Sequence, residues 1–217
     1  ALGSIMTADN VHATKGERMY DTGSTTFMLI CTMLVFLMTP GLAFFYGGLS
    51  RRKNVINTML MCFGAIGLGG VLWIVAGWSL AYGGDGSSAF TGGLDQLLCL
   101  LVADPVLQAA EGNAADGAVY PQIINIAFQM AFAMITAAIV TGSLAGRVKF
   151  GAMTAFLGIW LLVVYAPLAH MVWGGEGSFI GDIIGALDFA GGDVVHISSG
   201  LTGLILCLML GRRRGFG

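Results

Sequence analysis

The length of its uncharged apolar runs constrains this chain more than any other feature. Five runs are long enough to cross the hydrocarbon core of a bilayer, which takes roughly 20 helical residues. We place them at residues 25–49, 55–82, 119–145, 150–172 and 189–211. Composition agrees, because 56% of the residues are hydrophobic and 10% are charged, against roughly 25% charged in soluble domains. An integral membrane protein is therefore predicted.

The runs are predicted to be α-helices rather than the strands of a barrel. Barrel strands alternate apolar and polar residues over about ten positions, whereas these runs are continuous. Glycine recurs inside them, as in "GAIGLGG" at residues 64–70. In lipid, small residues let helix backbones approach closely, so tight helix packing is expected. The predicted fold class is an all-α membrane protein with five transmembrane helices.

The basic residues predict the orientation of these helices. Eight of the ten Lys and Arg residues fall on one side of the predicted membrane, which the positive-inside rule assigns to the cytoplasm. They are Arg51, Arg52, Lys53, Arg147, Lys149, Arg212, Arg213 and Arg214. All twelve acidic residues fall on the other side or at its junctions, so the N-terminus is predicted to lie outside. The basic residues are too few and too scattered for a nucleic-acid footprint.

The segments outside the helices carry few signals. Residues 1–24 form a polar extracytoplasmic segment that is not itself a signal peptide; a chain beginning at Ala1 fits either a mature form after cleavage or a shortened chain. In the outer link, "LDQLLCLLVADPVLQAA" at residues 94–110 is expected to form a short interfacial helix. Residues 212–217 would begin a cytoplasmic loop. The four cysteines have no CxxC spacing, so neither a metal site nor a cofactor is predicted.

The stretch "LDFAGGDVVHISSG" at residues 187–200 holds two ionisable candidates. Asp188 is a predicted N-cap of the fifth helix, its carboxylate accepting backbone N–H groups. His196 follows eight residues later, about 12 Å deeper along a continuous helix. An ionisable residue at that depth is costly unless it faces a cavity or a partner, which favours a functional role. The alternative is a neutral structural histidine bonded to a neighbouring helix.

Three aromatic residues belong to the same predicted end of the bundle. Phe128 and Phe132 are four residues apart and share a face in the outer half of the third helix, and Trp173 ends the fourth. Taken singly, the phenylalanines suggest packing and the tryptophan a membrane anchor. Together with an acid they would form a vestibule that attracts cations. His170 and His12 are expected to be structural.

Four stretches resemble the ammonium transporter family, which includes the yeast methylammonium permeases and the Rhesus glycoproteins, and specifically its bacterial Amt branch. The stretches are "MTPGLAFFYGGLSRRKN" (residues 38–54), "AFQMAFAMIT" (127–136), "PLAHMVWGG" (167–175) and "LDFAGGDVVHISSG" (187–200). They occur in order across nearly the whole chain, and the last is highly specific.

The resemblance implies a homotrimer in which each subunit holds a pore. Trp173, Phe128 and Phe132 would help to recruit ammonium at the outer mouth, and Phe132 would also form half of a stacked phenyl gate. Asp188 would support the recruitment site without being a clear direct ligand. His196 would be the first of two pore histidines that share a hydrogen bond. Ammonium would lose a proton near the gate, and neutral ammonia would pass.

Several features depart from the family pattern. Family members have eleven helices built on an inverted repeat, and only the first five are present here. The second histidine, the second gate phenylalanine and a recruitment serine belong to the absent half. The chain is therefore expected to be a fragment of a longer protein, or one part of a split subunit. Glu176 and Asp193 add negative charge at the mouth.

Two functions remain open at this point. One is transport of ammonium or ammonia across the cytoplasmic membrane; the other is ammonium sensing in a receptor, for example one fused to a histidine kinase. An enzyme is not expected, because no nucleophile, base and orienting group assemble in the helices. The expected partners are the lipid bilayer, the other half of the fold and, on the cytoplasmic face, a PII-type regulator.

Overall fold

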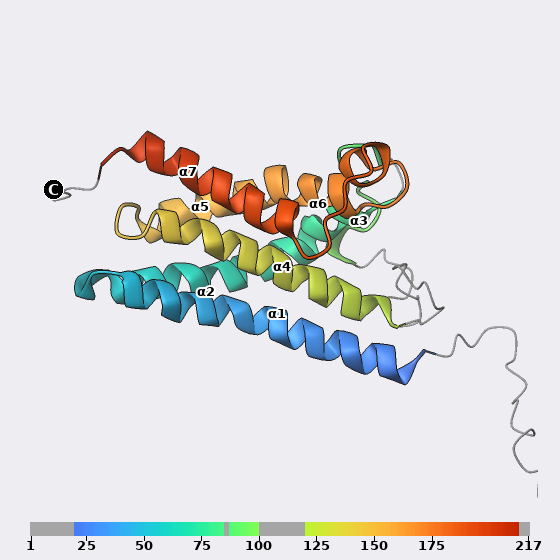
Figure 1. Ribbon diagram of the computed structural model, residues 1–217, viewed down its shortest axis with the longest axis horizontal. Helices are drawn as coiled ribbons and strands as arrows, with labels where there is room; N and C mark the ends of the chain where they lie inside the picture. Colours follow the sequence, from blue (N-terminus) through green and yellow to red (C-terminus); the bar gives the residue numbers. More distant parts are fainter. Residues whose placement is uncertain (1–19, 85–86, 100–119, 213–217) are drawn as a thin grey trace, which may run out of the picture.

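The computed structural model describes residues 20–84, 87–99 and 120–212. Five long helical stretches dominate this part of the chain (Figure 1). In order, they consist of α1 (Thr22–Leu49); η1 (Arg52–Asn54), α2 (Val55–Leu72), η2 (Trp73–Gly77) and α3 (Trp78–Tyr82); α4 (Gln122–Ser143); α5 (Phe150–Trp160), η4 (Leu161–Tyr165) and α6 (Ala166–Trp173); and η6 (Gly192–Ile197) and α7 (Ser198–Leu210). Two short turns, η3 (Leu97–Cys99) and η5 (Phe179–Ile183), lie in the connections.

By length and composition, all five stretches can cross a membrane. They run for 28, 31, 22, 24 and 19 residues, which spans the roughly 20 residues that a bilayer core requires. The predicted five-helix membrane fold is confirmed. The third stretch begins at Gln122, later than predicted, because Pro121 takes an extended conformation at the N-cap and disfavours helical geometry in the residue before it. The fifth begins at Gly192 rather than at residue 189.

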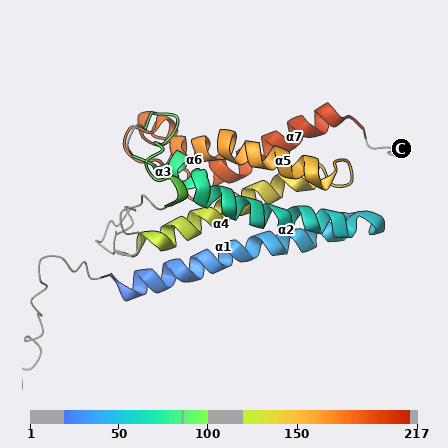
Figure 2. The same ribbon diagram turned by 180° about the vertical axis from the view of Figure 1, so that it is seen from behind.

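Helix α4 forms the centre of the bundle. Figures 1 and 2 show it between α1 and α7, and it contacts both of them as well as α2. Its middle is lined by small buried side chains, at Ala131, Ala133, Ala137 and Ala138. Small residues let neighbouring backbones approach, so α4 can pack against three helices at once.

Glycines make two of these contacts close. A Cβ at Gly69 of α2 would lie 3.2 Å from the Cα of Met134 on α4. A Cβ at Gly142 of α4 would lie 2.3 Å from the ring of Tyr46 on α1. The tight packing predicted for the "GAIGLGG" segment is therefore present at Gly69, although a Cβ at Gly67 would meet open space.

The second, fourth and fifth stretches each contain a π-helical segment, which the apolar pattern does not predict. The segments η2 and η4 bring Trp73 and Tyr165 together, with ring centroids 6.0 Å apart. Both side chains are almost fully buried. A π-helical turn adds a residue to the helix and so changes the face on which later side chains lie. Here two such turns face inward and build an aromatic core.

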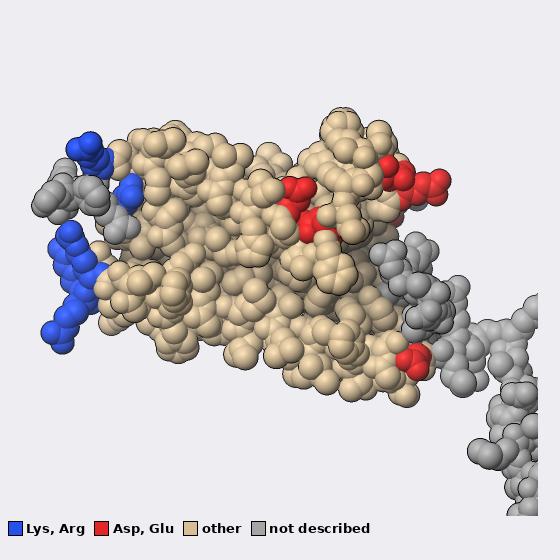
Figure 3. Space-filling model, in the orientation of Figure 1, with Lys and Arg blue, Asp and Glu red and all other residues tan. Residues whose placement is uncertain are grey.

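Charges separate along the bundle. Figure 3 shows Lys and Arg at one end and Asp and Glu in the other half. The basic end contains η1, the connection between α4 and α5, and the residue that follows α7 by two positions, Arg212. This separation agrees with the predicted topology, in which the basic end faces the cytoplasm. The orientation itself stays a prediction.

Some predicted features fall outside the described residues. They are the N-terminal segment up to residue 19 with His12, the greater part of the interfacial helix predicted at residues 94–110, and Arg213 and Arg214. Within residues 94–99, the structure has the short turn η3.

Candidate functional site

Phe128, Phe132 and Trp173 form a cluster between α4 and the end of α6. The ring centroids of Phe128 and Phe132 lie 5.0 Å apart with their planes at 90°, because residues four apart share one face of a helix. The centroids of Phe132 and Trp173 lie 6.1 Å apart at 57°. All three side chains are partly exposed. The structure thus brings the three aromatic candidates into one group.

A hydrogen bond connects this aromatic cluster to Asp188. The indole Nε1 of Trp173 donates to the backbone carbonyl of Asp188 at 3.0 Å. Trp173 is the last residue of α6, and Asp188 lies in the connection that leads to η6. The bond therefore fixes the indole ring relative to the start of the fifth helix. The sequence motifs place both residues near the mouth but do not predict this contact.

The carboxylate of Asp188 closes the beginning of the fifth helix. Its Oδ1 accepts from the N–H groups of Gly191 and Gly192 at 2.7 and 2.8 Å. Its Oδ2 accepts from those of Asp193 and Val194 at 2.9 and 3.0 Å. The first N–H groups of a helix have no intrahelical partner, and this one side chain satisfies four such donors. The predicted capping contact is present, although the N-cap position itself belongs to Gly191.

These bonds also stabilise the ionised form of the Asp188 carboxylate. Partial burial alone would raise the pKa of Asp188, but the four backbone N–H groups outweigh it and hold that pKa below its ordinary value of 3.8. The carboxylate is therefore ionised at neutral pH and fully engaged with its own backbone. A negative charge arranged in this way acts on a cation through its field rather than as a free ligand.

Gly191 is part of the site, although it is neither ionisable nor aromatic and the sequence does not mark it as a candidate. Its φ of +89° is a left-handed conformation that favours glycine. A Cβ here would lie 2.7 Å from the Cγ2 of Val195 and 3.9 Å from the ring of Phe132. The only signal for it in the sequence is the glycine pair that follows Asp188 by three residues.

The continuous helix assumed between Asp188 and His196 is not present. Residues 188–191 are not helical, so His196 is only in the first turns of the fifth helix, within η6. Its backbone N–H donates to the carbonyl of Gly191 at 3.0 Å. The separation of about 12 Å calculated for a continuous helix therefore does not apply. The imidazole is exposed.

His170 makes structural contacts. Its ring is buried, with Nδ1 and Nε2 each 2.8 Å from a backbone carbonyl oxygen, those of Ala81 and Ser88. This supports the structural role expected for it. Glu176 is exposed in the turn after α6, and Asp193 is partly exposed in η6. Both add negative charge in the half of the bundle that holds the aromatic cluster.

The comparison with known families decides what this arrangement belongs to. The model of the Ammonium Transporter Family matches residues 26–217. The chain belongs to this family. Among its relatives, the ammonium transporter of Mycobacterium tuberculosis H37Rv is 42% identical over 209 residues, which cover 90% of this chain and 44% of the relative. That of Bacillus subtilis is 45% identical over 193 residues, which cover 88% and 45%.

Solved structures agree with the family assignment. The crystal structure of Candida albicans Mep2 matches with a TM-score of 0.75 and 33% identity, covering 89% of this chain and 40% of that one. A structure described as a sensor Amt protein matches with a TM-score of 0.73 and 24% identity, over 87% and 44%; at that identity the likeness shows the fold alone. The chain spans about half the length of the curated relatives that it matches. The predicted fold, the first half of the transporter fold of this family, is confirmed.

Proposed function

We propose that this chain supplies the outer recruitment site and one half of the pore in a protein that moves ammonium or ammonia across the cytoplasmic membrane. The observation that carries this proposal is the cluster of Phe128, Phe132 and Trp173, held against the capping loop of Asp188. Relatives at 42–45% identity are named ammonium transporters. Ammonium is a cation, so a cluster that attracts cations would help to bind it at the mouth of the pore.

Recruitment would use aromatic faces and a remote negative charge. Aromatic faces attract ammonium groups within about 6 Å of the ring centroid, and three rings gather here. The carboxylate of Asp188 is occupied by four N–H groups, which fits a supporting role better than a direct one. The carboxylates of Glu176 and Asp193 would raise the local cation concentration further.

Passage would require the loss of one proton. Taking an intact ammonium ion out of water into an apolar pore costs on the order of ten kcal/mol or more, whereas neutral ammonia carries no such penalty. Ammonium would therefore release a proton near Phe132, and ammonia would continue. Potassium is similar in size but has no proton to lose, so the same pore would exclude it.

His196 would serve ammonia beyond the aromatic cluster. A neutral imidazole has one donor and one acceptor nitrogen, so it can hydrogen-bond a small neutral base. Its exposed position on the fifth helix leaves the ring open to the segment that completes the pore. We propose that this segment, from the same longer chain or from a separate one, brings the second histidine and the second gate phenylalanine.

The remaining partners are proposed on the family resemblance. They are two further copies of the protein in a homotrimer, a PII-type regulator at the basic end, and the lipid of the inner membrane. The alternative function is ammonium sensing in a receptor. Its support is the likeness to the sensor Amt structure, which concerns the fold alone. Transport is therefore proposed in preference to sensing.

Flux measurements test the proposal. In the full-length protein reconstituted in liposomes, His196→Asp is expected to abolish ammonia passage or to change its selectivity, because a charged carboxylate replaces a neutral partner. The control is Ile197→Val, which alters an exposed neighbour in the same turn and should leave uptake unchanged. Equal ammonium currents and equal methylammonium uptake in wild type and His196→Asp would reject the pore role. Ammonium binding without any flux in wild type would favour the sensor.

A further inference from the structure

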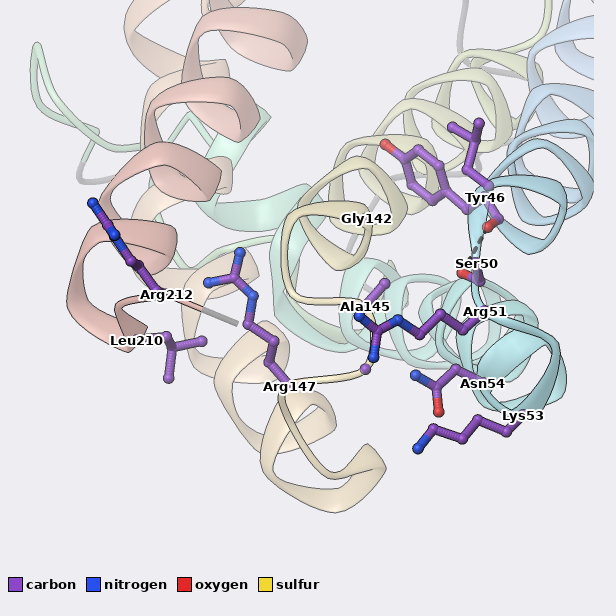
Figure 4. A pocket seen from close by; sticks show the side chains of 12 residues that line it. Tyr46, Ser50, Arg51, Lys53, Asn54, Gly142, Ala145, Arg147, Leu210 and Arg212 are labelled. Carbon is purple, nitrogen blue, oxygen red and sulfur yellow. Dashed lines mark hydrogen bonds between the residues drawn. The ribbon is translucent and has the colours of Figure 1, made fainter. Parts of the chain in front are cut away.

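We infer that the basic end of the bundle holds a binding site for a phosphate-bearing anion. A cavity of about 840 Å³ opens there, bounded by the ends of α1, α4 and α7 (Figure 4). Ligand sites in proteins commonly measure roughly 300–1,000 Å³. Four cationic side chains line the cavity: Arg51, Lys53, Arg147 and Arg212.

The charges converge from parts of the chain that are far apart in sequence. Arg51 and Lys53 come from the connection after α1, Arg147 from the connection after α4, and Arg212 from the end of α7. Figure 4 shows the first two on one side of Ala145, and Arg147 and Arg212 on the other. No Asp or Glu occurs among the described residues that line the cavity. Like charges that gather without a counter-ion repel one another, and a bound anion would relieve that repulsion.

The positive-inside rule explains only part of this pattern. It accounts for basic residues on one side of a membrane but does not require that they share a cavity. Arg52 and Lys149 lie at the same end and do not line it. Only some of the basic residues at this end therefore line the cavity.

The walls of the cavity are fixed by internal contacts. The hydroxyl of Tyr46 donates to the carbonyl of Ile139 at 3.2 Å, and its ring lies on Gly142, where a side chain would clash. The hydroxyl of Ser50 donates to the carbonyl of Tyr46 at 2.8 Å. These contacts hold the connection after α1 against α4. A preformed wall lowers the entropic cost of binding a ligand.

The guanidinium of Arg147 has N–H donors without a hydrogen-bond acceptor in the described part of the chain. A guanidinium has five N–H groups. Nη1 of Arg147 donates to the carbonyl of Gly211 at 3.0 Å, and Nη2 donates to the sulfur of Cys207 at 3.6 Å. Its buried Nε has no hydrogen-bond partner in the described part of the chain. Nη1 and Nη2 each carry a second N–H besides these bonds, and guanidinium groups bind phosphate oxygens in pairs, so a phosphate in the cavity would use these two donors.

Two sources of phosphate fit this position. Basic pockets between transmembrane helices on the cytoplasmic side bind anionic lipid headgroups, and the same charges would bind a soluble phosphate such as a nucleotide. The test uses purified full-length protein in detergent and measures binding of phosphatidylglycerol, phosphatidylcholine, ATP and inorganic phosphate. The paired variant Arg51→Gln/Lys53→Gln is compared with Arg52→Gln/Lys149→Gln, which removes the same charge from the same end.

Binding of at least one phosphate anion is expected to weaken about tenfold in Arg51→Gln/Lys53→Gln, the effect of losing charge-assisted hydrogen bonds, and less than about twofold in the control. Tighter binding of phosphatidylglycerol than of phosphatidylcholine, without ATP binding, assigns the site to lipid; the converse assigns it to a soluble phosphate. Equal weakening in both variants would show a diffuse surface effect and overturn the proposal. Failure of the wild type to prefer any of these anions over phosphatidylcholine would overturn it as well.

Discussion

The indole Nε1 of Trp173 donates to the backbone carbonyl of Asp188 at 3.0 Å, while the carboxylate of the same Asp188 caps the first N–H groups of η6. One residue thus joins the end of the fourth helix to the beginning of the fifth. Trp173 belongs to the aromatic cluster, and η6 carries His196. A change in the aromatic cluster is therefore expected to affect the helix that carries His196.

Trp173→Phe tests the joint. The variant keeps an aromatic ring but loses the N–H, so the carbonyl of Asp188 loses its partner and the ring is free to reorient. One lost hydrogen bond of roughly 1 kcal/mol corresponds to about fivefold in binding. The half-saturation concentration for ammonium uptake is expected to rise by about that factor. Trp173→Leu, which also removes the ring, should have a larger effect.

Trp160→Phe is the matched control for Trp173→Phe. Its Nε1 donates to the Oγ1 of Thr202 at 3.1 Å, so the substitution removes the same kind of interhelical bond away from the aromatic cluster. It should lower stability without changing half-saturation. Equal half-saturation in wild type and Trp173→Phe would remove Trp173 from the recruitment site.

Asp188→Asn should destabilise the protein in a pH-dependent manner. The pKa of Asp188 is lowered in the folded state, because the backbone N–H groups favour its ionised form over the cost of burial. Its stabilisation is therefore present above the ordinary value of 3.8 and is lost as pH falls through the lower folded value. For a partly exposed cap the loss at pH 7 is about 1 kcal/mol, or roughly 2–4 °C in melting temperature.

Melting curves of wild type and Asp188→Asn in detergent check this pH dependence. The difference between them should be largest at neutral pH and shrink below the ordinary pKa of an aspartate. Asp193→Asn, one turn away, removes a carboxylate that makes none of the four capping bonds and should show a smaller difference. A melting difference for Asp188→Asn that does not vary with pH would contradict the capping role of the charge.

Much of the fold follows from local sequence properties. The five helices could be predicted because apolar length is local: each run either is or is not long enough to cross a bilayer. The π-helical turns could not be predicted, since they depend on how Trp73 and Tyr165 pack across two helices. The start of the fifth helix was misplaced by three residues, because the apolar pattern does not show that Asp188 reaches forward to Val194.

The sequence predicts which residues form the candidate site, but it does not predict the contacts that join them. Residue type and motif predict Phe128, Phe132, Trp173 and Asp188, and the structure places these residues together. The Trp173 bond joins positions 15 residues apart across an irregular segment, which helical periodicity cannot describe.

Gly142→Ala is expected to destabilise the packing of α1 against α4. In most helix interiors the change from Gly to Ala is favourable by about 1 kcal/mol. Here the added Cβ would lie 2.3 Å from the Tyr46 ring, so the ring must move and its bond to the carbonyl of Ile139 is strained. Overpacking of this kind costs about 1–3 kcal/mol. A lower melting temperature is expected.

Gly48→Ala serves as the control for Gly142→Ala. A Cβ at Gly48 of α1 would meet nothing within 4 Å, so helix propensity alone should act and the melting temperature should not fall. If both variants raise the melting temperature, Tyr46 relaxes without cost and the close contact has no energetic role.

His170→Phe is expected to loosen the connection that follows α3. Both nitrogens of His170 face carbonyl oxygens, of Ala81 and Ser88, at 2.8 Å. A carbonyl only accepts, so the ring keeps both bonds only with both nitrogens protonated, and a neutral ring keeps one. Phenylalanine keeps the volume and loses every donor. Losing even one bond should speed amide exchange in residues 87–93 about fivefold or more.

Hydrogen exchange followed by mass spectrometry measures this loosening directly. The amide of Gly92 donates to the carbonyl of Leu80 at 2.7 Å, and that of Ser88 to Thr91 at 2.8 Å, so both report on the segment that His170 holds. His196→Phe is the control, because it removes an exposed imidazole elsewhere and should leave these amides unchanged. Unchanged exchange in His170→Phe would mean that the other contacts of the connection, such as the bond from the Ser79 hydroxyl to the carbonyl of Gly93, hold it without the imidazole.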